Sequence, residues 1–92
     1  MEADGIVLIG NKDLDKYLYT AFYPLGTEGK VKIIARGNHC MKALNVLAIL
    51  IREYVDDSSY DIIVDSEKFD ERFVTTIEIE LRGKQKDGKF NK

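Results

Sequence analysis

The chain has 92 residues, of which 45% are hydrophobic and 33% are charged. This length and balance indicate a single folded domain, because disordered chains carry too few apolar residues to build a core. The lone cysteine, Cys40, excludes an intrachain disulfide and predicts a reducing environment. We expect a soluble cytoplasmic protein, since the sequence shows no leader-like start and no apolar run near the ~18 residues of a membrane span.

The net charge of −2 is unevenly distributed. Residues 1–82 hold 10 Lys and Arg against 15 Asp and Glu, a net charge of −5, whereas residues 83–92 carry a net charge of +3. Duplex-binding proteins usually show a basic face, because neutralising phosphates supplies most of their affinity. We therefore expect weak attraction to phosphate, and divide the chain into one domain, 1–82, and a mobile Lys-rich tail, 83–92.

The first predicted elements are a strand and an amphipathic helix. The run GIVLIG, residues 5–10, predicts a short buried strand between two glycines. Asn11 or Asp13 is expected to cap the next helix, whose apolar residues recur at helical spacing. Pro24 is expected to end or kink this helix before a second strand at residues 30–35.

The second predicted helix is apolar on nearly all sides. Asn38 is expected to cap it, and residues 39–55 hold more apolar side chains than one face requires. Such a helix is covered on two sides, once by its own sheet and once by something else. Beyond it, residues 60–64 predict a strand, 65–70 a charged turn and 71–82 a closing strand.

The order β-α-β-α-β-β predicts a two-layer α+β fold. Right-handed crossovers place both helices on one face of a four-stranded mixed sheet. In residues 77–82, Ile and Leu alternate with Glu and Arg, which is typical of a strand with one face in solvent. The acidic alternation is therefore expected on the face opposite the helices.

The sequence offers little for catalysis or metal binding. His39 and Cys40 are adjacent, so on a helix they point about 100° apart and cannot pair as base and nucleophile. One histidine and one cysteine are too few for a convincing zinc site, although carboxylates could complete one. We expect no enzyme activity, no cofactor, no metal and no small-molecule substrate.

The clearest candidate site is the turn between the second strand and the second helix. Segment 36–38, Arg-Gly-Asn, precedes a helix N-terminus, where free N–H groups and the positive dipole end favour an anion. The first strand-to-helix junction ends at the same edge of the sheet. Spacing alone favours ordinary surface cations around a structural glycine turn over a phosphate site. The candidate nucleic-acid-binding residues are Asn11, Lys12, Arg36, Gly37, Asn38 and Lys42.

Three motifs resemble the Alba family of small archaeal chromatin and RNA-binding proteins. VLIGNKDLDKYL (7–18) is similar to the family's VLIGKK-type opening, and IIARGNHCMKAL (33–44) to its KARGRAISKAV segment. TTIEIELRGK (75–84) is similar to its closing STIEI strand. The resemblance covers residues 5–84 and implies the fold above, which is similar to the C-terminal domain of a bacterial translation initiation factor. It also implies sequence-independent DNA or RNA binding.

A homodimer is a further implication of the resemblance. In the family, the apolar second helix and the last strands form the dimer contact. An aromatic near the end of that helix, a position that Tyr54 occupies here, lies where dimers meet. A second subunit would explain the apolar helix. The residues that we predict at the dimer interface are Leu47, Leu50, Ile51 and Tyr54.

The chain departs from the family pattern in its charges. Asn11 replaces one of two lysines, and Asn38 replaces the second arginine of the turn. The hairpin is expected to be shorter than the family's basic hairpin, and its sequence DSEKFDER (65–72) has four acids against Lys68 and Arg72. We therefore expect a divergent, acidic Alba-like homodimer whose binding to DNA or RNA is weak, biased to RNA, or lost.

Two alternatives remain open. A dimeric scaffold protein that no longer binds nucleic acid would suit the acidic body, but not the retained cations or the Lys-rich tail. A subunit of an RNA-processing complex is the other alternative. If nucleic acid is bound, we expect the protein to be associated with the nucleoid.

Overall fold

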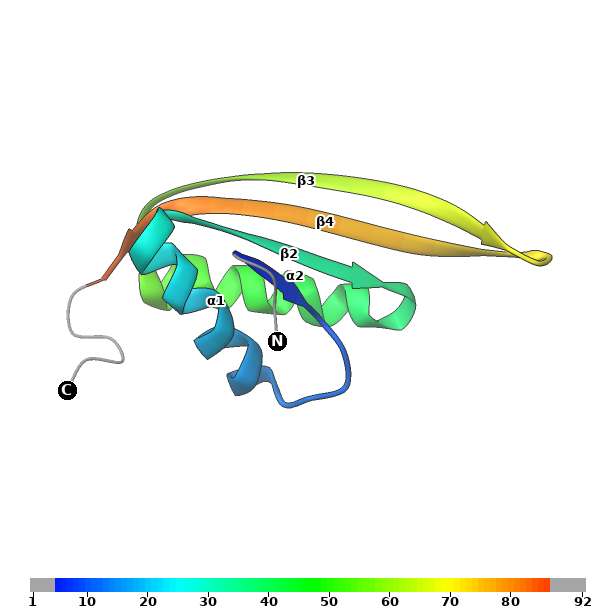
Figure 1. The fold of residues 1–92 in the computed structure, drawn as a ribbon, viewed down its shortest axis with the longest axis horizontal. Coiled ribbons are helices and arrows are strands. Elements are labelled where there is room, and N and C mark those ends of the chain that lie inside the picture. The colour runs from blue at the N-terminus through cyan, green and yellow to red at the C-terminus, as the bar shows by residue number, and fades with distance from the viewer. Residues whose placement is uncertain (1–4, 87–92) are drawn as a thin grey trace.

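A four-stranded sheet carries two helices on one of its faces in the computed structural model, which describes residues 5–86 (Figure 1). The strand order is β1-β2-β4-β3, with β1 parallel to β2 and the other neighbours antiparallel. The mixed four-stranded sheet and the two-layer α+β architecture are those that the sequence predicts. The elements are β1 (Ile6–Leu8), α1 (Leu14–Glu28), β2 (Lys30–Arg36), a 3-10 turn η1 (Gly37–His39), α2 (Cys40–Ile49), a π-helical turn η2 (Leu50–Tyr54), β3 (Val55–Phe69) and β4 (Arg72–Gln85).

Helix α1 begins at one of the two expected positions and ends later than expected. Its N-cap position is Asp13, and it continues through Pro24 to Glu28. Pro24 and Leu25 are buried, so packing against the core offsets the hydrogen bond that the proline cannot donate. The helix ends at Gly29, whose φ of 77° is left-handed and whose N–H bonds the Leu25 carbonyl oxygen at 3.1 Å.

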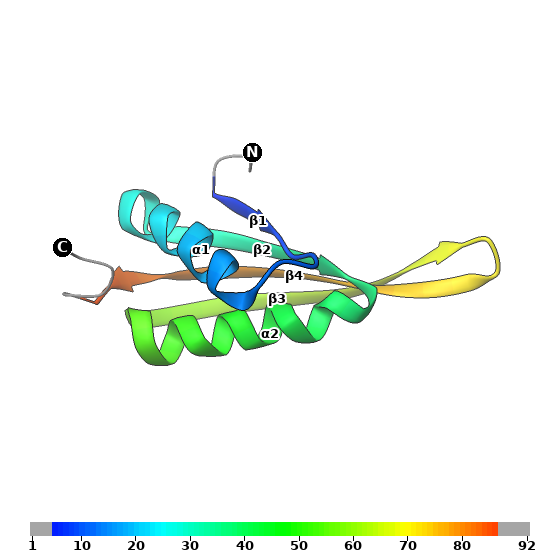
Figure 2. The same ribbon diagram turned by 90° about the horizontal axis from the view of Figure 1, so that it is seen from below.

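Helix α2 begins one residue later than expected. The turn η1 intervenes, so His39 and not Asn38 holds the N-cap position. Helical structure then continues through η2 to Tyr54, close to the predicted end. Figure 2, which views the helical face, shows α1 over the β1–β2 side of the sheet and α2 over the other side.

The core lies between the helices and the inward face of the sheet. Every second residue of β2 and β4 points into it, because side chains alternate across a strand. Helix α2 contributes its own inward face, and the fully buried Leu50 of η2 continues it. The buried residues of these elements are Val31, Ile33, Ala35, Ala43, Val46, Leu47, Leu50, Ile77, Ile79 and Leu81.

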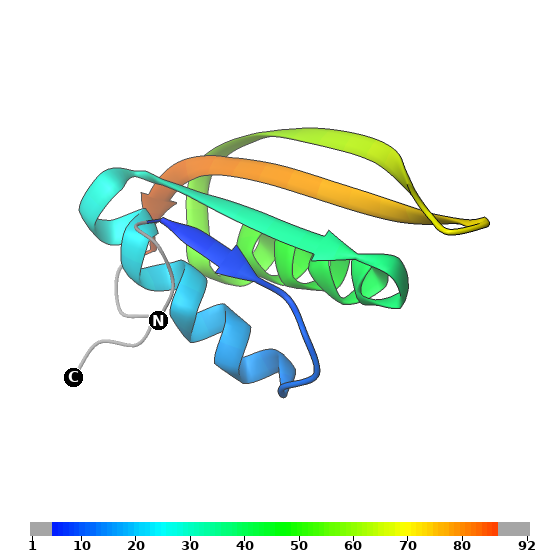
Figure 3. The same cartoon turned by 45° about the vertical axis from the view of Figure 1, so that its right-hand side comes forward.

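Strands β3 and β4 extend well beyond the end of β2. The last β2 residue, Arg36, pairs with Thr76, and beyond this point β3 and β4 pair only with each other. The resulting arm projects from the body in Figures 1 and 3, and the longest dimension of the molecule is 49 Å against 24 and 22 Å for the others. We call residues 65–76 the hairpin arm.

The expectation of a charged turn at 65–70 is therefore wrong. Pairing continues to Phe69 opposite Arg72, which leaves a two-residue turn of Asp70 and Glu71. Asp70 has a φ of 55°, a conformation that aspartate tolerates better than most residues. The acids suggested a loop, but on an exposed two-stranded arm they point into water and do not oppose strand formation.

The folded domain also extends past residue 82. Gly83, Lys84 and Gln85 belong to β4, contrary to the expected boundary and to a tail that is mobile from residue 83. The Gln85 amide nitrogen donates to the Phe22 carbonyl oxygen at 2.8 Å, and the Lys86 N–H donates to the Tyr54 carbonyl oxygen at 2.9 Å. The remainder of the predicted tail, residues 87–92, lies outside the described residues.

Gly83→Ala tests this extension of the sheet. A Cβ at position 83 would collide with the Val55 side chain and lie 3.0 Å from the Asp56 carbonyl oxygen. We expect the free energy of unfolding to fall by about 1–3 kcal/mol in chemical denaturation, as is usual for overpacking. The control is Lys84→Ala at the exposed neighbouring position, which should change stability by less than about 0.5 kcal/mol. Equal changes in the two variants would contradict the packing of Gly83.

Candidate nucleic-acid interface

Two turns that are distant in sequence lie side by side at one edge of the sheet. Residues 9–13 connect β1 to α1, and β2 leads through η1 into α2. The Lys42 ammonium group of α2 donates to the carbonyl oxygens of Gly10 and Lys12, both at 2.9 Å. The second helix therefore holds the β1–α1 loop in place directly.

Tyr17 completes this arrangement from α1. Its hydroxyl oxygen accepts hydrogen bonds from the backbone N–H groups of Gly10 at 2.8 Å and Lys12 at 3.0 Å. The Lys42 nitrogen also lies 5.6 Å from the centre of the Tyr17 ring, within the range of a cation–π interaction. The sequence did not predict that Tyr17 accepts hydrogen bonds from the loop, since Tyr17 fits the apolar stripe of α1 and no motif sets it apart.

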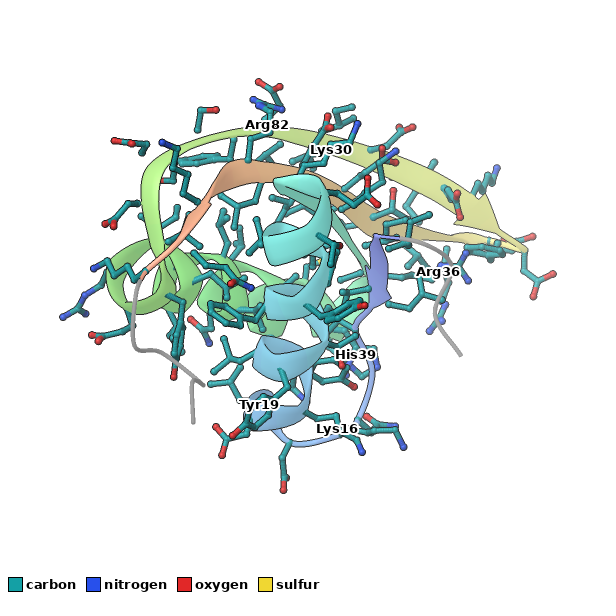
Figure 4. The ribbon with its side chains drawn as sticks, turned by 60° about the vertical axis from the view of Figure 1, so that its left-hand side comes forward. Lys16, Tyr19, Lys30, Arg36, His39 and Arg82 are labelled. Atoms are coloured by element: carbon teal, nitrogen blue, oxygen red, sulfur yellow. The ribbon has the colours of Figure 1, made fainter. Side chains whose placement is uncertain are left out.

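Lys42 is thus mainly a structural cation. An ammonium group has three donors, and the loop carbonyls take two of them. Its charge still adds to the local potential, but its geometry is set by the loop. Asn11 and Lys12 are exposed in the loop, and Lys16 lies next to it near the start of α1 (Figure 4).

Arg36 lies at the base of the hairpin arm and interacts with it (Figure 4). Its side chain is 62% exposed, and its guanidinium nitrogen Nη2 is 3.5 Å from the Glu67 carboxylate. The guanidinium carbon also lies 5.2 Å from the centre of the Phe69 ring. An exposed ion pair of this kind contributes only about 0–1 kcal/mol, so a phosphate could displace Glu67 at little cost.

Gly37 has a backbone reason to be glycine. Its φ of 62° lies in the left-handed region, where other residues are strained. A Cβ there would make only an ordinary 3.7 Å contact with Val74, so conformation and not space sets the requirement. Asn38 follows it as an exposed residue of η1.

Two of the predicted dimer-interface residues are misplaced. Leu47 and Leu50 are buried within the subunit, because they lie on the inward side of α2 and η2. They therefore cannot present their side chains to a partner. Ile51 and Tyr54 are half-buried, and the Tyr54 ring packs edge-on against Phe22 with the ring centres 5.7 Å apart.

A different apolar surface lies open beside α2. Lys42 reaches the β1–α1 loop from one flank of the helix, and the opposite flank carries Met41, Leu44, Ala48 and Ile51 at spacings of three or four residues. On β3, exposed apolar side chains lie opposite the buried residues of β4 and so face the helical side. These are Tyr60, Ile62 and Val64. We call this combined surface the α2–β3 face.

The described residues include no group of three or more His, Cys, Asp or Glu side chains that could hold a metal ion. Cys40 is half-buried, with its sulfur 3.7 Å from the Thr75 carbonyl oxygen. Across residues 5–86, neither helix has the length and apolar character needed to cross a membrane.

Lys42→Met tests whether this cation organises the loop. The variant keeps most of the side-chain stem but leaves the carbonyl oxygens of Gly10 and Lys12 without their donor. We expect stability to fall by about 1.5–3 kcal/mol, the usual scale for hydrogen bonds to a charged group. The backbone amides of Gly10 and Lys12 should exchange faster with deuterium. Lys16→Met is the control, and unchanged exchange in Lys42→Met would contradict the role.

Comparison with known proteins places this geometry among the Alba-like folds. No protein-family model and no curated protein sequence matches the chain. Among solved structures, Alba from Thermoplasma volcanium has a TM-score of 0.75 and 28% sequence identity, covering 84% of this chain and 98% of that one. The resemblance of the three sequence motifs is thereby confirmed at the level of the fold. The chain has an Alba-like fold, with a sequence that diverges from that protein.

Proposed function

We propose that this protein is a homodimeric, nucleic-acid-binding Alba-like protein that binds DNA or RNA weakly and without sequence preference. The observation that carries the proposal is that the β1–α1 loop, held by Lys42, and the turn that follows Arg36 lie at the same edge of the sheet, at the base of the projecting hairpin arm. Two exposed turns with cations at the base of the arm offer a surface for a phosphate backbone. The Alba-like fold supports the same function.

The proposed weakness follows from charge. The hairpin arm has four acids against Lys68 and Arg72, a net charge of −2. Glu67 pairs with Arg36, and Lys42 is committed to loop carbonyls, so Lys12 is the candidate cation that is most open to phosphate. Each phosphate that is not neutralised removes about 0.9 unit from the salt dependence of binding to a duplex.

A dimeric scaffold that does not bind nucleic acid is the second candidate. The Arg36–Glu67 ion pair favours it, since the one arginine of the turn already has an anionic partner in its own chain. An RNA-processing subunit would share the nucleic-acid-binding surface of the first proposal. A place at the nucleoid in the cytoplasm would follow from binding chromosomal DNA.

The α2–β3 face supports the dimer within this proposal. Its apolar side chains come from two neighbouring elements and form one uncovered surface on the helical side. Exposed apolar surface of this kind is typical of a protein contact. A second copy on this face would cover the outward flank of α2. A dimer contact at this flank explains the excess of apolar residues in the helix better than a contact at Leu47 and Leu50 does.

Val64→Lys and Ile63→Lys form a matched test of the dimer. Val64 is 65% exposed and faces the helical side, whereas Ile63 is 61% exposed and lies on the opposite face, across from Glu78. We expect Val64→Lys to give a monomer in equilibrium sedimentation, because a lysine would be buried without a partner. Ile63→Lys should remain dimeric. A wild-type monomer at micromolar concentration, or the same outcome for both variants, would contradict the proposed face.

Arg36→Ala and Glu67→Gln test the binding surface from opposite directions. Arg36→Ala should weaken binding to a short duplex and reduce the salt slope by about 0.9 unit for each phosphate that Arg36 neutralises. Glu67→Gln should strengthen binding, because it releases Arg36 and removes a charge that repels phosphate. The readout is affinity across a salt series.

The controls for this pair lie away from the site. Lys30 is at the other end of β2 from Arg36 (Figure 4), and Glu80 pairs with Arg82 on the sheet face opposite the helices. Lys30→Ala and Glu80→Gln should therefore have smaller effects than the test variants. Binding that is indifferent to both Arg36→Ala and Glu67→Gln would place the surface elsewhere.

A further inference from the structure

The end of the hairpin arm carries two exposed phenylalanines. Phe69 is the last residue of β3, and Phe73 is the second residue of β4, so the two flank the turn. Phe73 is 71% exposed. A phenylalanine has no polar group to offer water, and on a projecting arm it does not reach the subunit's core. Two such rings at one tip indicate a surface that receives a partner.

The register of the arm places the two rings on opposite faces. Phe69 pairs with Arg72, and Phe73 pairs with Lys68, so the rings belong to successive pairs of the ladder and alternate in direction. Each ring has a cation beside it. Arg36 lies 5.2 Å from the centre of Phe69, and the Lys68 nitrogen lies 5.8 Å from the centre of Phe73.

The charge of the arm excludes electrostatic attraction to a phosphate backbone but allows bases to stack on its rings. With a net charge of −2, the arm cannot follow a phosphate backbone by electrostatic attraction. Stacking of a base on an aromatic ring does not need a basic surface, and guanidinium groups beside such rings extend the stacking surface. The pairing of each ring with one cation suits a base more than a backbone.

We infer that the end of the hairpin arm is a base-stacking site, in which Phe69 and Phe73 receive unpaired nucleobases of single-stranded DNA or of RNA loops. This inference rests on the proposed function and adds the class of ligand. Arg36 and Lys68 flank the stacked bases, and the acids of the arm keep it off regular duplex. The protein thereby favours nucleic acid with unpaired bases, and part of its affinity is insensitive to salt.

A second copy of the chain is the rival occupant for Phe73, which lies on the same side of the sheet as Val64 and the α2–β3 face. Phe73 is four residues beyond Ile77 along β4, or about 13 Å further out on the arm. Phe69 points to the other side, where the α2–β3 face does not extend. A single contact on that face therefore cannot cover both rings.

The test compares Phe73→Ser with Tyr23→Ser in the full chain. Tyr23 is 73% exposed, almost the same as Phe73, but it lies on α1, away from the arm. The probes are an oligodeoxythymidine and an oligouridine of about 12 nucleotides, in the range of known single-strand sites, and a duplex of equal length. Affinity is measured between about 50 and 200 mM salt.

Phe73→Ser should weaken binding to the unpaired probes by about 5- to 150-fold, without a change in salt slope or in duplex affinity. Phe69→Ser should act in the same direction, while Phe73→Trp should retain binding because its ring also stacks. Tyr23→Ser should match the wild type. A stronger effect with one probe than with the other identifies the preferred source of unpaired bases, DNA or RNA.

The outcomes separate this inference from the proposed function. If duplex binding depends on Arg36 but Phe73→Ser behaves like Tyr23→Ser with the unpaired probes, the stacking site is wrong and the function stands. If no probe binds the wild type at the lower salt, both are wrong. If sedimentation shows that Phe73→Ser is a monomer, and the loss of the dimer accounts for its weaker binding, a second copy covers the ring and the stacking site is wrong.

Discussion

The register between β2 and β4 is the constraint on which the rest of the structure depends. Because Arg36 pairs with Thr76, the three-residue β1 and the seven-residue β2 end where β3 and β4 continue as a free arm. The same register points Ile77 and Ile79 inward and the acids between them outward. A shift of one residue would exchange the two faces and remove Arg36 from the base of the arm.

The helices and strands could be predicted from the sequence because their apolar periodicities are strong. The orientation of α2 and the length of the hairpin could not be predicted, because periodicity carries no information about them. The apolar residues of α2 indicated an excess over one face, but not which flank faces the sheet. Leu47 and Leu50 were assigned to the wrong side for that reason. The acids of residues 65–70 indicated a loop, yet strand pairing tolerates charge on a solvated arm. The roles of Tyr17 and Glu67 could not be predicted, because both depend on interactions between distant segments.

In the proposed function, the candidate interface combines the shape of a binding surface with a low charge. The left-handed Gly37, the loop geometry and the position of Arg36 are all present. Two of its cations already have partners, since Lys42 serves the loop and Arg36 has a carboxylate partner. The ion pair of Arg36 is exposed and weak, so it competes with phosphate without blocking it. Affinity is therefore adjustable by single charges on the arm, while the fold stays the same.

In the proposed function, a dimer would raise the affinity of a surface that binds nucleic acid weakly. Two linked copies of a site bind with an affinity well above that of either alone, since the second contact is made at a high effective concentration. In the proposed dimer, each subunit contributes one turn with Arg36 and one arm with its two rings. The electrostatic part of the binding falls with salt, whereas the stacking part does not, so the balance between them sets which nucleic acids are held under cellular conditions. An acidic body then favours nucleic acid with unpaired bases over regular duplex, because a duplex gains only the weaker, electrostatic part of the binding free energy.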